Sequence, residues 1–122
     1  MFRFEQLDIW KLAIDYGNKL YNIAKDFPKE EIFGLGDQLR RAAVSISNNI
    51  AEGCGDTDKG FIAFLNISVK SSLETVNILH FAQKRGYISE TVKNELYVEA
   101  EILIKKIRAF KNSIRNTPFA TS

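Results

Sequence analysis

The sequence predicts an all-α protein, an antiparallel up-down-up-down four-helix bundle built from a single chain of 122 residues. Three observations predict this fold. Apolar side chains recur at three- and four-residue intervals along four long segments, which is the spacing of helices with one buried face. The only two prolines, Pro28 and Pro118, lie outside those segments, and no Asn-Gly turn, Asp-Gly turn or alternating run indicates a strand. The connections are short, which favours antiparallel neighbours.

The first two helices are each predicted from one apolar face. Residues 8–26 begin at Asp8, whose carboxylate can accept an orphan backbone N–H bond of the first turn. The apolar face of this segment consists of Ile9, Ala13, Tyr16, Leu20, Ala24 and Phe27. Residues 36–53 carry a narrower stripe and end at Gly53, a residue suited to the left-handed position after a helix. This stripe consists of Leu39, Ala42, Ala43, Ile46 and Ile50.

Two longer helices are predicted in the second half of the chain. Residues 57–85 begin with the candidate cap Asp58 and end before Gly86, which suits the left-handed position after a helix. The core face of this segment consists of Phe61, Phe64, Leu65, Val69, Ser72, Val76 and Leu79. Residues 89–116 follow, with Ser89 as the N-cap because its hydroxyl can accept from a free backbone N–H.

The composition is that of an ordinary globular domain, with 45% hydrophobic and 26% charged residues. We therefore expect one domain, residues 1–116, followed by a flexible tail, residues 117–122, because two domains of half this length could not bury useful cores. A single cysteine cannot form an internal disulfide. The N-terminus lacks the apolar core of a signal peptide, and no apolar run is long enough for a membrane span. We expect a cytoplasmic protein, and the net charge of +2 is too small to indicate a partner.

Three of the predicted helices carry more apolar side chains than one bundle core requires. The additional residues lie outside the core faces at 100° per residue. Those assigned to an oligomer interface are Trp10, Tyr21, Ile67, Ile78 and Phe81. Single apolar residues on a surface are common, but a surplus that recurs on several helices favours self-association.

A polar flank lies beside the apolar stripe of residues 36–53. Its members recur at three- and four-residue intervals and can therefore interact along one side of the helix. They are Gln38, Arg41, Ser45, Asn49 and Glu52, and Glu74 is a candidate partner of Arg41. Two interpretations stay open: a polar seam buried between helices or subunits, and a solvated helix face.

The same region resembles a known family. Residues 38–46, Gln-Leu-Arg-Arg-Ala-Ala-Val-Ser-Ile, and residues 49–53, Asn-Ile-Ala-Glu-Gly, are similar to the signature of the 23S rRNA intervening-sequence proteins. Flanking segments agree, among them Phe27-Pro28 and residues 71–74, Ser-Ser-Leu-Glu. The sequence departs from the family at Ser47, where many members have a proline.

The resemblance implies a small four-helix bundle that assembles into a ring-shaped homopentamer. The chain is also similar to the accessory variability protein of diversity-generating retroelements, a pentamer with a basic surface that contacts nucleic acid and a reverse transcriptase. Neither relative is an established enzyme. The ribosomal-RNA name reflects where some of the genes lie, so it is weak support for RNA binding.

No motif in the sequence indicates catalysis, a cofactor or a metal. Cys54 lies at a helix C-terminus, where the helix dipole disfavours a thiolate. His80 has Asn77 three residues before it, so the Glu-x-x-His pair of a di-iron bundle is absent. The paired glycines lack the Gly-Lys-Ser/Thr of a phosphate loop. We therefore expect no enzymatic activity, no cofactor and no metal site.

A basic cluster occupies the end of the last predicted helix. Its candidate nucleic-acid contacts are Lys105, Arg108, Lys111 and Arg115. These cations could neutralise phosphates of RNA or DNA. They could equally be a solvated helix end whose charge suits the helix dipole. A ring would repeat and concentrate the charge.

The leading hypothesis is a non-catalytic, ring-forming homo-oligomeric scaffold, a pentamer by resemblance, with RNA or DNA as a candidate partner and no contact with a membrane. The alternative is a protein-interaction module that recruits another polypeptide without nucleic-acid contact.

Overall fold

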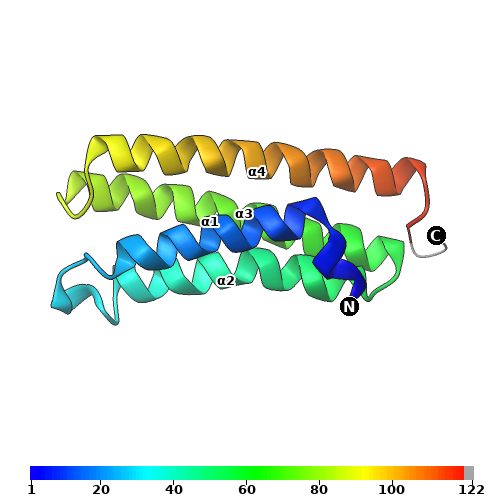
Figure 1. Cartoon of the computed structure of the whole chain (residues 1–122), viewed down its shortest axis with the longest axis horizontal. Coiled ribbons are helices and arrows are strands. Elements are labelled where there is room, and N and C mark those ends of the chain that lie inside the picture. Colours follow the sequence, from blue (N-terminus) through cyan, green and yellow to red (C-terminus); the bar gives the residue numbers. More distant parts are fainter. Residues whose placement is uncertain (120–122) are drawn as a thin grey trace.

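Four helices lie side by side along the long axis of the molecule in the computed structural model, which describes residues 1–119 (Figure 1). They are α1 (Asp8–Ala24), α2 (Leu35–Cys54), α3 (Asp58–Lys84) and α4 (Glu90–Asn116). Consecutive helices run in opposite directions (Figure 1), and no strand occurs within residues 1–119. The predicted fold class is confirmed, and each predicted helix boundary lies within about two residues of the observed one.

The helix starts follow the capping chemistry only in part. Ser89 caps α4 as predicted, because its Oγ accepts from the backbone N–H of Val92 at 3.1 Å. Helix α3 is capped by Thr57 instead of Asp58: its Oγ1 accepts from the N–H of Gly60 at 3.1 Å. Asp8 is the first residue of α1 and makes no capping bond, although its charge there suits the positive end of the helix.

The two glycines expected at helix ends differ in role. Gly86 has φ +78° and so adopts the left-handed conformation predicted for it. Gly53 lies inside the last turn of α2, where a Cβ would be 2.7 Å from Phe61 and 2.8 Å from Phe64. The absence of a side chain therefore lets the end of α2 pack directly against the start of α3, which is a different reason from the predicted one.

The bundle core consists of apolar side chains from all four helices. The fully buried members with large side chains are Tyr16, Leu20, Leu39, Ile46, Ile50, Phe61, Leu65, Leu79, Leu103 and Ile107. Packing is unequal around the bundle, because α2 and α3 are in extensive contact and α1 and α4 touch least. Among neighbouring helices, the least extensive packing therefore lies between α1 and α4.

A series of buried hydroxyl groups follows α3 through this core. Ser68 Oγ donates to the carbonyl of Ile46 at 2.9 Å, and Ser72 Oγ donates to the carbonyl of Ser68 at 2.9 Å. Thr75 Oγ1 donates to the carbonyl of Ser72 at 2.6 Å, so the 2.8 Å contact between Thr75 and Tyr16 has the tyrosine as donor. Every hydroxyl is thereby satisfied, as burial requires.

One apolar residue placed outside the core by periodicity is buried in it. Ile78, expected at an oligomer interface, is only 2% exposed. Ile78 follows Ser71 by seven residues and therefore shares its face, and Ser71 contacts Ser45 of α2 at 2.7 Å. Because α3 packs against helices on more than one side, its buried face is wider than a single stripe. The assignment of Ile78 to a surface was wrong.

The first and last described segments meet at one end of the bundle. The short 3₁₀ helix Arg3–Gln6 precedes α1, and Arg3 Nη2 donates to the carbonyl of Phe119 at 2.9 Å. Phe119 also packs edge-on against Phe61 and Phe110. The tail predicted to be flexible is thus docked as far as Phe119, and the remainder of the tail, residues 120–122, lies outside the described residues.

Candidate functional site

The charged members of the polar flank are solvated. Arg41 has a side chain 79% exposed, and its Nε donates to Asp37 Oδ2 at 2.7 Å, one turn earlier on the same helix. Glu74, the candidate partner of Arg41, is exposed and forms no ion pair with it, and Glu52 and Gln38 are exposed as well. For these residues the solvated interpretation is correct.

The uncharged members of the flank form a seam between α2 and α3. Ser45 Oγ lies 2.7 Å from Ser71 Oγ, and Asn49 Nδ2 donates both to the carbonyl of Ser45, at 2.7 Å, and to its Oγ, at 3.0 Å. These side chains are half-buried or buried. Both interpretations therefore apply. The small polar side chains form the seam, and the charged side chains form the solvated face.

The basic cluster at the end of α4 keeps its charge largely uncompensated. Lys105, Arg108 and Arg115 are exposed, and within residues 1–119 none of them forms an ion pair. Lys111 is half-buried, and its Nζ donates to Asn66 Oδ1 of α3 at 2.9 Å. Three of the four predicted cations are therefore available to a polyanion, whereas Lys111 is partly engaged within the bundle.

Two surfaces of the first three helices carry the exposed apolar side chains that bear on the predicted interface. The α1–α2 patch consists of Ile14, Tyr21 and Val44, which line one shallow depression. The α3 ridge consists of Ile67 and Phe81, which share a helix face because they are two heptads apart; Phe81 is 57% exposed. Tyr21, Ile67 and Phe81 thus lie outside the core, and their assignment to an oligomer interface stays a prediction.

The remaining interface candidate, Trp10, is engaged within the chain. Its ring is half-buried and makes an edge contact with Phe4, with ring centroids 5.2 Å apart. It also packs against the core of the bundle. Trp10 therefore serves to hold the N-terminal 3₁₀ helix on α1 and offers little surface to a second molecule.

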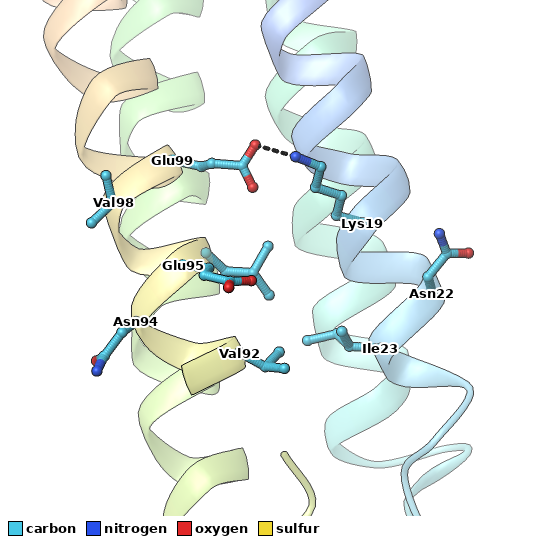
Figure 2. A pocket seen from close by; sticks show the side chains of 9 residues that line it. Lys19, Asn22, Ile23, Val92, Asn94, Glu95, Val98 and Glu99 are labelled. Carbon is cyan, nitrogen blue, oxygen red and sulfur yellow. Dashed lines mark hydrogen bonds and ion pairs between the residues drawn. The ribbon is translucent and has the colours of Figure 1, made fainter. Parts of the chain in front are cut away.

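An open groove lies between α1 and α4, the neighbouring helices with the least extensive packing (Figure 2). It encloses about 820 Å³. Ile23 and Val92 face one another across it in Figure 2, and Leu96 adds to its apolar floor. On the other side of the Lys19–Glu99 ion pair lies a separate, smaller hollow of about 180 Å³, lined by Leu12, Ile102 and others.

Charged groups stand around this groove, and most of them are acidic. Lys19 Nζ bridges the two helices by an ion pair with Glu99 Oε1 at 2.6 Å (Figure 2). The hydrogen bond from Lys19 to Glu99 raises the pKa of the lysine, and the negative charges of Asp15 and Glu95 raise it further. Asp15 and Glu95 themselves form no ion pair within residues 1–119, so the groove carries a surplus of negative charge.

The two side chains weighed for reactivity have ordinary surroundings. Burial raises the pKa of the Cys54 thiol, which disfavours the thiolate. His80 is exposed and makes an edge contact with Tyr97, with ring centroids 6.0 Å apart. In the described part of the chain, no group of three or more His, Cys, Asp or Glu side chains is placed to hold a metal ion.

Sequence periodicity did not identify the α1–α4 groove. The groove depends on how closely two helices approach, and Lys19 and Glu99 are far apart in the chain. One signal was present: Glu95 and Glu99 are four residues apart and therefore share a face of α4.

Sequence reasoning also missed the exposure of Phe33. Phe33 lies in the connection before α2 and is 93% exposed. Two residues earlier, Glu31 accepts a hydrogen bond from Tyr87 Oη at 2.9 Å, which holds this connection against the turn before α4.

The fold and these surfaces define a small four-helix-bundle protein with exposed apolar and charged faces. Residues 5–109 match the sequence profile of the 23S rRNA-intervening sequence proteins, and the chain belongs to that family. A crystal structure of a protein of unknown function from the S23 ribosomal protein family of Bacteroides thetaiotaomicron has the same fold, with a TM-score of 0.77 at 21% identity. The match covers 84% of this chain and 97% of that one. No curated protein matches the chain, and no helix within residues 1–119 is long and apolar enough to cross a membrane.

Proposed function

We propose that the protein is a non-catalytic cytoplasmic scaffold that assembles into a homo-oligomeric ring, a pentamer by its family resemblance, and contacts RNA or DNA through the basic cluster of α4. The observation that carries this proposal is the presence of two separate exposed apolar surfaces, the α1–α2 patch and the α3 ridge. A single cysteine, Cys54, which is free, suits a reducing compartment.

Two different surfaces favour a ring over a twofold dimer. A twofold interface uses the same patch on both subunits, whereas contact between two different patches is heterologous and closes into a ring when the rotation allows it. The α1–α2 patch contains a small-residue depression at Gly17 and Ser47. A bulky side chain such as Phe81 of the neighbouring subunit is a suitable occupant for it.

Assembly would also strengthen nucleic-acid contact. One subunit offers three free cations, Lys105, Arg108 and Arg115, and each phosphate that they neutralise releases counterions. A ring multiplies these contacts on one particle, and avidity then raises the affinity without new chemistry. The resemblance of the sequence to the accessory variability protein implies a pentamer with a basic surface and is the second support for this assignment.

The first test concerns assembly. At micromolar concentration, gel filtration with light scattering should give a mass near five times 13.9 kDa, and Phe81→Glu should shift it to the monomer because a carboxylate would be buried in the interface. Asn112→Glu, which adds the same charge at an exposed position of α4, should leave the mass unchanged. A wild-type mass of one subunit would contradict the ring.

The second test concerns nucleic acid. Labelled RNA and duplex DNA should bind weakly and with little sequence preference, because no base-reading or stacking side chains accompany the cluster. Log affinity should fall with log salt by about 0.9 for each duplex phosphate contacted. Reversing Lys105, Arg108 and Arg115 to Glu should abolish binding in an anisotropy titration.

The control for this test reverses the same number of charges elsewhere. Lys11, Lys25 and Lys29 are exposed and lie outside the cluster, so their change to Glu gives the same net charge and should weaken binding far less. An equal loss of affinity in both variants, or no binding by the wild type at low salt, would contradict nucleic-acid binding by the cluster. The cluster would then be only a solvated helix end.

A further inference from the structure

We infer that the α1–α4 groove binds a cationic amphipathic helix of another protein. This site shares no residue with the α1–α2 patch, the α3 ridge or the basic cluster, so neither the assembly nor the nucleic-acid contact proposed above uses it. The inference does not depend on either of them. It rests on the shape of the groove, its apolar floor and its surplus of acidic groups.

The dimensions of the groove suit one to two turns of a helix. Its lining extends along α1 from Lys19 to Ile23 and along α4 from Val92 to Glu99. These stretches are about 6 Å and about 11 Å long at 1.5 Å per residue, which is between one and two helical turns. The floor is apolar at Ile23, Val92 and Leu96, and an amphipathic helix fills such a groove with side chains at i, i+3, i+4 and i+7.

The negative charge around the α1–α4 groove favours a cationic partner. Three carboxylates, Asp15, Glu95 and Glu99, surround one ammonium, that of Lys19, and only Glu99 is paired with it. Lysines or arginines flanking the apolar face of an incoming helix would pair with Glu95 at the rim of the groove and with Asp15 beside the neighbouring hollow. The whole chain has a net charge of +2, so attraction of a cation to this protein must come from a local acidic surface such as this one.

Other occupants fit less well. Phosphates of a nucleic acid would be repelled by the same carboxylates. The tail of the chain itself is docked at the opposite end of the bundle as far as Phe119. A second copy offers its cationic half of α4, but from Lys105 onward the only exposed apolar side chain of that helix is Ala109, which could not fill the floor.

The inference is tested by binding of a labelled Leu–Lys peptide of about 14 residues, with leucines on one helical face. Anisotropy at low salt should show micromolar binding that weakens as salt is raised. Glu95→Lys should weaken it at least about tenfold, because a carboxylate that attracts the peptide becomes a cation that repels it. The matched Leu–Glu peptide should not bind.

The control variant is Glu101→Lys, which makes the same charge change at an exposed position of α4 outside the groove; it should change the affinity by less than about twofold. Equal weakening by Glu95→Lys and Glu101→Lys would overturn the site. So would the absence of binding by the wild type, or binding by the assembly-deficient Phe81→Glu variant alone, which would assign the groove to a second copy.

Discussion

Replacing Ile78 with lysine should unfold the bundle. Ile78 is 2% exposed within the core, so a lysine there must either bury its ammonium group or displace the packed side chains around it. Burying the charge, or neutralising the lysine against its normal pKa, costs at least about 4 kcal/mol. That is a large part of the 5–15 kcal/mol by which domains of about this size are stable. Circular dichroism with urea unfolding would measure the loss.

Two matched variants separate this effect from an effect on assembly. Ile78→Val removes one buried methylene and should cost about 1 kcal/mol. Phe81→Lys introduces the same charge three residues later, at an exposed site. Once the assembly is dissociated by dilution, this variant should keep the free energy of unfolding per subunit within about 0.5 kcal/mol of the wild-type value. A folded Ile78→Lys monomer with wild-type stability would mean that Ile78 lies on a surface after all.

The stability of the bundle should fall in alkali because of Tyr16. Burial raises the pKa of Tyr16 to about 12, against 10.0 for an exposed tyrosine. The folded state therefore favours the neutral phenol. Its contribution is fully present below pH 10 and is lost as the pH rises from 10 through 12, to a total of about 3 kcal/mol.

Comparison with Tyr16→Phe isolates this titration from that of the lysines. The variant should lose about 1 kcal/mol at neutral pH, because the hydrogen bond to Thr75 is gone. Above pH 10 the difference should shrink and then reverse, since a phenylalanine cannot ionise. Urea unfolding at several pH values would show this crossing, and parallel curves for the two proteins would contradict it.

Periodicity and capping chemistry predict most of this fold from the sequence. The 3.6-residue spacing sets the four helices, and the alternation of long helices with short connections sets their antiparallel order. Local chemistry predicts the cap at Ser89 and the left-handed Gly86 because both depend on a few adjacent residues. Gly53 could not be assigned correctly, because its role depends on Phe61 and Phe64 of the next helix.

The surfaces were harder to predict than the core. A helical wheel assigns each helix one buried face, whereas α3 packs on more than one side, and so Ile78 was misplaced. Wide spacing of charges along one helix did not reveal whether Arg41 reaches another helix; in the structure it pairs with its own-helix neighbour Asp37. The α1–α4 groove was not foreseen, because no sequence rule states that one pair of neighbours packs less closely than the others.

The contact between Arg3 and Phe119 makes the backbone nearly circular. The first and last described segments adjoin at one end of the bundle. The same packed structure could therefore be built with the termini placed at another connection between helices. A permuted gene that joins these ends by a short linker and opens the chain at the turn around Gly86 would preserve every helix. In such a molecule α4 would be synthesised first and α3 last, so the order in which the helices leave the ribosome could be changed without altering the packed structure.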